Sequence, residues 1–64
     1  MTINDLLAAG IEIQGSVQVK RGQMVYLSDS VYSIPEEIRE LEIKYIYPDA
    51  VDNENGIVVY EVEE

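Results

Sequence analysis

The sequence predicts an α+β fold, a small antiparallel four-stranded sheet with two short helices in the order α-β-β-α-β-β. Four segments carry the alternating or apolar patterns of strands, and two carry the start and stop signals of short helices. The connections are short, which favours antiparallel neighbours. With 64 residues, the chain forms one domain, residues 1–64, and buries a modest fraction of its surface.

The first predicted helix covers residues 2–10. Thr2 is a suitable N-cap, and Asp5 lies in the first turn, where a carboxylate favours the helix dipole. Gly10 tolerates the left-handed conformation that ends a helix. A helix this short is not stable alone in water, so we expect it to dock through Leu6 and Leu7.

Residues 11–20 and 23–28 are predicted to form the first two strands. In the first, the residues of the buried face are Ile11, Ile13, Val17 and Val19. Gly15 interrupts this run and indicates a bulge or a close backbone approach. A two-residue hairpin at Arg21-Gly22 would pair Lys20 with Gln23.

The side-chain pattern of residues 23–28 leaves the register of this hairpin open. The two-residue loop puts Met24 and Tyr26 on the face of Val17 and Val19, whereas a loop one residue longer puts Val25 and Leu27 there. Both faces are apolar, so self-association into a homodimer is one way to cover the second face.

The second predicted helix covers residues 34–41, and Pro35 suits its first helical position. Two further strands are predicted after it, at residues 42–47 and 57–64. In the third strand one face holds Ile43, Tyr45 and Tyr47; in the fourth, Val58, Tyr60 and Val62. Among the tyrosines, we expect core or half-buried sheet positions for Tyr26, Tyr45 and Tyr60, and exposed positions for Tyr32 and Tyr47.

The composition excludes several functions. Without Cys or His there is no disulfide, no thiolate chemistry, no ordinary zinc site and no His-based catalytic triad. No Gly-rich loop lies between a strand and a helix to bind phosphate. The first residues show no basic n-region and no apolar h-region of the usual length, so we expect no signal peptide, and the apolar runs are too short for a membrane span. We therefore expect a cytoplasmic protein that is not an enzyme, uses no cofactor and binds no membrane.

The segment DAVDNENG, residues 49–56, resembles a calcium loop only in part. When Gly56 is aligned with the glycine of an EF-hand loop, Val51 and Val62 fall where oxygen ligands are required. An EF-hand is therefore excluded. A weak surface site for a divalent ion and a plain polar loop that ends in an Asn55-Gly56 turn both remain open.

The unusual property of the chain is its formal net charge of −9. Residues 1–35 carry three acids against two basic residues, and residues 36–64 carry ten against two. This charge repels nucleic acid and attracts a protein partner with a cationic surface. The alternative is that acidity only keeps the protein soluble and guards strand edges. The candidate partner-binding acids are Glu36, Glu37, Glu40, Asp49, Asp52, Glu54, Glu61 and Glu63.

Both ends of the chain resemble small uncharacterised acidic proteins encoded by prophages and integrative mobile elements of Gram-positive bacteria. The matching segments are LLAAGIEIQGSVQVK and EIKYIYPDA…GIVVYEVEE, whereas residues 21–40 show no resemblance. The resemblance brings no site residues, but it implies a protein that binds and blocks a larger host machine, such as a nucleic-acid-handling protein. The alternative is an accessory domain that binds through apolar sheet surface.

Overall fold

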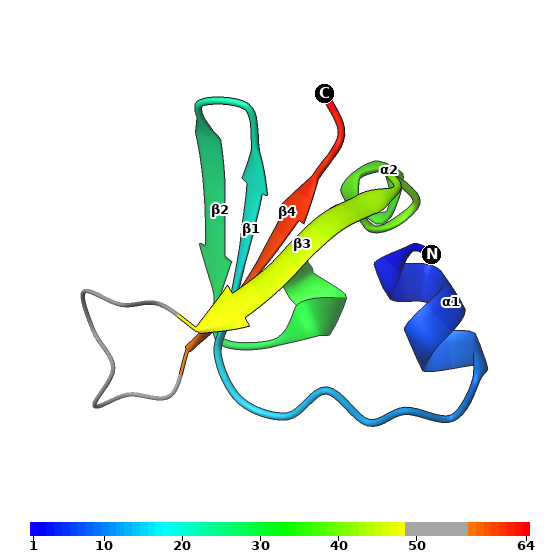
Figure 1. Cartoon of the computed structure of the whole chain (residues 1–64). Coiled ribbons are helices and arrows are strands. Elements are labelled where there is room, and N and C mark those ends of the chain that lie inside the picture. The colour runs from blue at the N-terminus through cyan, green and yellow to red at the C-terminus, as the bar shows by residue number, and fades with distance from the viewer. Residues whose placement is uncertain (49–56) are drawn as a thin grey trace.

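The computed structural model describes residues 1–48 and 57–64, which form a four-stranded sheet with short helices packed on one face (Figure 1). The elements in chain order are α1 (Ile3–Ala8), β1 (Val17–Arg21), β2 (Met24–Ser28), the 3-10 helix η1 (Val31–Ser33), α2 (Glu36–Arg39), β3 (Ile43–Pro48) and β4 (Val58–Val62). The α+β class is confirmed. None of the described helices has the length and apolar character that a membrane crossing requires.

The sheet is mixed, and the prediction of a purely antiparallel sheet is wrong. Its strand order is β2-β1-β4-β3. The hairpins β1–β2 and β3–β4 are antiparallel, but the inner strands β1 and β4 pair in parallel. Short connections predict antiparallel neighbours only within each hairpin. The segment between the hairpins passes through η1 and α2, and it brings the second hairpin beside β1 instead of β2.

The hydrophobic core lies between the helices and one face of the sheet. Each helical segment contributes one fully buried side chain: Ile3 from α1, Val31 from η1 and Ile38 from α2. The inner strands contribute the buried residues Val17, Val19, Tyr60 and Val62, and Leu6 and Leu7 pack against this cluster. The predicted docking of the first helix is therefore confirmed.

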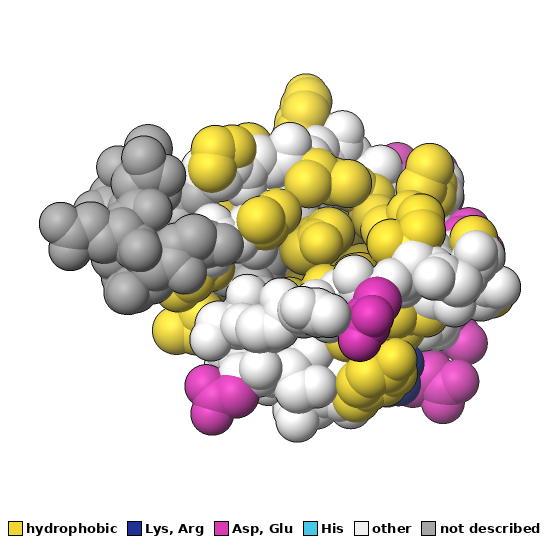
Figure 2. Space-filling model, turned by 90° about the horizontal axis from the view of Figure 1, so that it is seen from below, with side chains coloured by type: hydrophobic (Ala, Val, Ile, Leu, Met, Phe, Trp, Pro, Cys, Tyr) yellow, Lys and Arg dark blue, Asp and Glu magenta, His cyan; other side chains and the backbone are white. Residues whose placement is uncertain are grey.

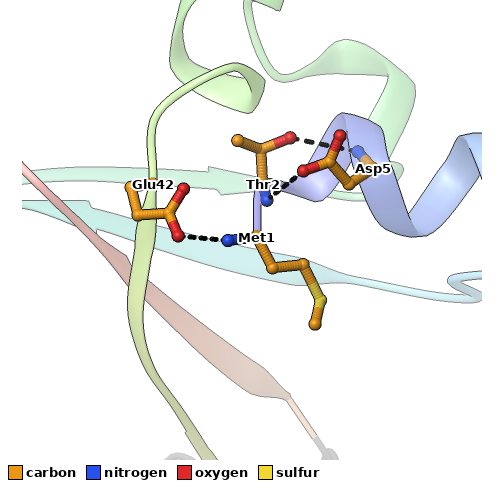
Figure 3. A network of polar contacts seen from close by, with 4 residues as sticks. All are labelled: Met1, Thr2, Asp5 and Glu42. Carbon is orange, nitrogen blue, oxygen red and sulfur yellow. Dashed lines mark hydrogen bonds and ion pairs between the residues drawn. The ribbon is translucent and has the colours of Figure 1, made fainter.

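A capping box holds the start of α1, as the sequence predicts (Figure 3). The Asp5 backbone N–H donates to Thr2 Oγ1 at 3.0 Å, and the Thr2 N–H donates to Asp5 Oδ2 at 3.0 Å. Thr2 also forms an isolated antiparallel bridge with Glu42, directly before β3. This cap therefore fixes α1 against the beginning of the second hairpin.

The first strand is shorter than predicted, since residues 11–16 are not strand. Gly15 has φ of +77°, a conformation that interrupts an extended run. A Cβ added at Gly15 would have no atom within 4 Å, so the expected close approach is absent there. Ile11 is 49% exposed and does not join the core.

The β1–β2 hairpin closes one residue later than predicted. Arg21 pairs with Met24 and Val19 with Tyr26, so the two loop residues are Gly22 and Gln23. Gly22 has φ of +61°, as the first position of a type II′ turn requires. Relative to the predicted pairing the register shifts by two residues, which preserves the faces. Tyr26 therefore lies on the Val19 side, as the two-residue alternative states.

A β-bulge at Lys44 changes the faces of β3. Ile43 pairs with Val62, but Tyr45 pairs with Glu61, so Lys44 is the extra residue. The prediction that side chains alternate strictly between the two faces over residues 42–47 is therefore wrong after Ile43. Tyr45 and Tyr47 lie on the face opposite Ile43, away from the helices.

The bulge also explains the exposure of the tyrosines. Tyr45, which is predicted to occupy a core or half-buried sheet position, is 60% exposed, and Tyr47 is half-buried instead of exposed. The remaining predictions are confirmed, because Tyr60 is buried, Tyr26 is half-buried and Tyr32 is 70% exposed.

The helical segments between β2 and β3 also differ from the prediction. The expected helix over residues 34–41 is the four-residue α2, with Pro35 as its N-cap in place of its first residue. The segment before α2, for which no helix is predicted, contains η1, whose N-cap Ser30 accepts a hydrogen bond from the Tyr32 N–H through its side-chain hydroxyl.

Replacing Thr2 with Ala removes the acceptor of the cap. We expect the free energy of unfolding to fall by about 1 kcal/mol, the usual cost of losing a Thr cap. Urea denaturation followed by circular dichroism measures this change. Thr2→Ser keeps the hydroxyl and is the control. If Thr2→Ser destabilises the protein as much as Thr2→Ala does, the cap is not the stabilising contact.

Candidate functional site

Three predicted acids, Glu36, Glu37 and Glu40, lie exposed on α2 and at its C-terminal cap. The helix begins after Pro35, whose extended backbone sets the chain direction, and the acids of its first turn favour the helix dipole. Ile38 is 2% exposed and anchors the segment in the core. The acids are therefore held on the outer surface of α2.

Glu63 lies beside Glu42, an acid that is not in the predicted set. The Glu63 backbone N–H donates to the Glu42 carbonyl at 2.9 Å, which continues the β3–β4 pairing. The Glu42 carboxylate also forms an ion pair with the Met1 ammonium (Figure 3). The β3–β4 register, which brings these two residues together, is the signal that could have identified Glu42.

Glu64 is a second acid outside the predicted set, and it lies against the β1–β2 turn. A Cβ added at Gly22 would overlap the Glu64 carboxylate. Glycine at this position therefore allows the carboxylate to rest on the turn, directly after Lys20 and Arg21. No sequence pattern links residues 22 and 64, so this contact could be found only in the structure.

Glu61 lies on the other face of the sheet. It alternates with the buried Tyr60 and Val62, and the Tyr47 hydroxyl donates to Glu61 Oε2 at 3.3 Å. The sheet therefore separates Glu61 from the acids of α2, and the described acids of the predicted set do not share one face. Three further predicted acids, Asp49, Asp52 and Glu54, lie outside the described residues, as do the hypothetical metal site and the Asn55-Gly56 turn.

We define the acidic rim as the exposed acids of α2, of the start of β3 and of the end of β4. In Figure 1 these three segments are neighbours, in agreement with the pairing of Ile43 with Val62. The members of the rim are Glu36, Glu37, Glu40, Glu42 and Glu63, whereas Glu64 rests on the β1–β2 turn and is not counted with them.

The basic residue of α2 points away from this rim. Arg39 is half-buried, its Nε donates to the Ile34 carbonyl at 3.1 Å, and its Nη1 donates to Asn4 Oδ1 at 3.3 Å. These two bonds tie α2 to α1 and to the segment before it. Within the described residues, the Met1 ammonium forms the one ion pair with an acid of the rim.

Acids also lie elsewhere on the molecule. Viewed from below, apolar side chains gather across the middle of the surface, and acidic side chains occur at several separate places (Figure 2). Outside the rim, the exposed acids that the structure describes include Asp5, Glu12 and Asp29. The charge is therefore concentrated at the rim without being confined to it.

The face of the sheet opposite the helices is mostly uncharged and is exposed at its margins, although Val59 of β4 is buried on it at 1% exposure. Lys20 of β1 and Glu61 of β4 are register partners at its centre. The margins are apolar, with Val25 at 54% exposure and Leu27 at 65% on β2, and Tyr45 at 60% on β3. We call this surface the open face.

The part of the chain that the structure describes shows no pocket and no group of three or more acids, His or Cys arranged to hold a metal ion. Among the described residues, one titratable group has a perturbed affinity for its proton. Burial in the core raises the pKa of the Tyr60 phenol above its ordinary value of 10.0, because the phenolate would lose its hydration.

These features define a small α+β protein with a mixed four-stranded sheet, one helix-covered face, one open face and an acidic rim. Comparison with protein-family models, curated proteins and solved structures finds no match. The resemblance to proteins of prophages and mobile elements therefore stays a prediction.

The raised pKa of Tyr60 predicts a loss of stability in alkali. The native state favours the neutral phenol, so its stabilising effect is complete below pH 10 and is lost as the pH rises through the native pKa. We expect the urea midpoint of the protein to fall between pH 9 and pH 11, and we expect Tyr60→Phe to reduce this fall. An equal fall in both proteins would contradict the prediction.

Proposed function

We propose that this protein is a non-enzymatic interaction protein whose acidic rim binds a cationic surface of another protein. The observation that carries the proposal is the grouping of five exposed carboxylates on α2, before β3 and after β4, while Arg39 bonds inward. Exposed charges of one sign steer an oppositely charged partner and speed association.

The geometry of the rim supports recognition of a defined surface. The carboxylates are mounted on a helix anchored by Ile38 and on paired strand ends, so their spacing is set by the fold. Lys or Arg side chains of a partner would meet acids whose backbone positions are set by the fold, so binding does not have to order the backbone that carries them. Because the rim is exposed, such binding is sensitive to salt.

In its finer form, the proposal is that the partner is a nucleic-acid-handling host protein, which the acidic rim inhibits. A cleft that binds a phosphate backbone presents the cationic groups that the rim would attract. The net charge of −9 and the resemblance to mobile-element proteins support this form.

The open face supports a second candidate function, that of an accessory domain which binds through apolar sheet surface. Val25, Leu27 and Tyr45 are more than half exposed there. In that case the acids keep the protein soluble, and binding persists in high salt.

Paired charge substitutions distinguish the two candidates. The variant Glu40→Gln/Glu63→Gln neutralises two acids of the rim, whereas Glu12→Gln/Asp29→Asn neutralises two exposed acids elsewhere and changes the net charge equally. A partner captured from a Gram-positive lysate is purified, and its affinity is measured by calorimetry at low and high salt. We expect the rim variant to bind about three- to tenfold more weakly, with the control unchanged.

The same complex tests whether the partner is a nucleic-acid-handling protein that the acidic rim inhibits. If the partner binds nucleic acid, addition of this protein should displace the nucleic acid, and the rim variant should displace it less. Binding that is indifferent to salt and to both variants would refute the charge-led proposal. If Tyr45→Ser weakens binding of the partner while the rim variant does not, the result would favour binding through the open face.

A further inference from the structure

Within the part of the chain that the structure describes, the outer edge of β2 has no strand paired with it. In the described ranges 1–48 and 57–64, β2 pairs with β1 alone and forms one edge of the sheet. It holds no charged residue, no Pro and no bulge, and Met24, Val25 and Leu27 are each more than half exposed. Natural edge strands commonly carry such protection, because a regular apolar edge is a template for another strand.

The other edge of the same sheet, β3, carries these protective features. It contains the bulge at Lys44, and its last residue is Pro48, which has no N–H to donate. The contrast within one sheet singles out β2 as the edge that is open to strand pairing.

The hairpin register shows which backbone groups of β2 point outward. A two-residue turn closes on a hydrogen-bonded pair, here Arg21 and Met24, and such pairs alternate along the ladder. Met24, Tyr26 and Ser28 therefore direct their N–H and C=O groups toward β1. Val25 and Leu27 direct theirs outward, away from the sheet.

We propose that β2 pairs antiparallel with β2 of a second copy of this chain, centred on Tyr26. In this register Val25 of each copy faces Leu27 of the other, and each pair exchanges two backbone hydrogen bonds. The contact is self-complementary, as a two-fold dimer requires. Val25 and Leu27 of both copies then form one apolar cluster on the continuous open face.

The distribution of charge favours a second copy as the occupant. Two chains of net charge −9 repel each other, and the surface with the weakest repulsion is one without acids. β2 is uncharged, and its neighbour β1 carries Lys20 and Arg21, two positive charges beside the Glu64 carboxylate that rests on the turn between the strands. The register also places Asp29, which follows β2, opposite Gln23 of the second copy, two residues from Arg21.

Analytical ultracentrifugation of the full chain from micromolar to millimolar concentration tests the proposal. We expect the mass to approach twice that of the chain. Val25→Glu should raise the dissociation constant at least tenfold. Tyr45→Glu is the matched control, because it adds the same charge on the open face at similar exposure but lies on β3, and it should leave the dimer intact.

Amide hydrogen exchange by NMR separates edge pairing from packing of the open faces. We expect the Val25 and Leu27 amides to become protected as concentration rises, while the Tyr26 amide, already bonded to β1, is protected throughout. Val25→Pro removes one outward N–H on an edge strand that tolerates this change, and it should abolish the dimer. The proposal would be overturned if the protein stays a monomer at all concentrations, or if the Val25 and Leu27 amides exchange freely in a dimer. It would also be overturned if Tyr45→Glu raises the dissociation constant as much as Val25→Glu does.

Discussion

The parallel contact between β1 and β4 is the interaction on which the rest of the structure depends. Two hairpins that are marginal separately become one sheet through this contact. It brings Val17 and Val19 beside Tyr60 and Val62, and these four side chains form the floor on which each helical segment buries one apolar residue. Without this contact neither hairpin would present an apolar surface wide enough to hold α1 and α2.

That contact also fixes the position of the functional surfaces. Each inner strand, β1 and β4, is paired on both sides, so the outer strands β2 and β3 form the two edges of the sheet. Helices cover one face, and the other face stays open. The end of β4 lies beside the start of β3 and near α2, so acids far apart in the sequence gather at one corner of the molecule.

Local signals in the sequence predicted the local structure well. The Thr2 cap, the left-handed Gly10 that follows α1, and the buried positions of Tyr60 and Val62 follow from residue types and spacing. Val58, which is predicted on the same face, is 36% exposed, whereas Val59 on the other face is buried. The parallel contact does not follow, because it depends on how η1 and α2 cross the sheet. The bulge at Lys44 is equally hidden, since the residues around it keep a regular alternation while their faces change.

The same distinction holds for the candidate site. The acids of α2 and Glu63 could be selected from composition, but Glu61 alternates to the open face, a position that only the sheet defines. Glu42 and Glu64 were missed because their neighbours come from strand pairing and from the turn at Gly22. Charge counting therefore finds the acidic half of the chain but not the arrangement of its carboxylates.

The two proposed contacts are compatible because they use opposite edges of the sheet. Pairing through β2 would give an eight-stranded sheet with β3 at each end, and therefore an acidic rim near each end. Seven strand spacings of about 4.8 Å separate the two β3 strands by roughly 34 Å. This distance exceeds a Debye length of about 8 Å at physiological salt, so repulsion between the rims is screened. The acidity that suits the rim to a cationic partner therefore adds little repulsion between paired copies, and each dimer would present two rims.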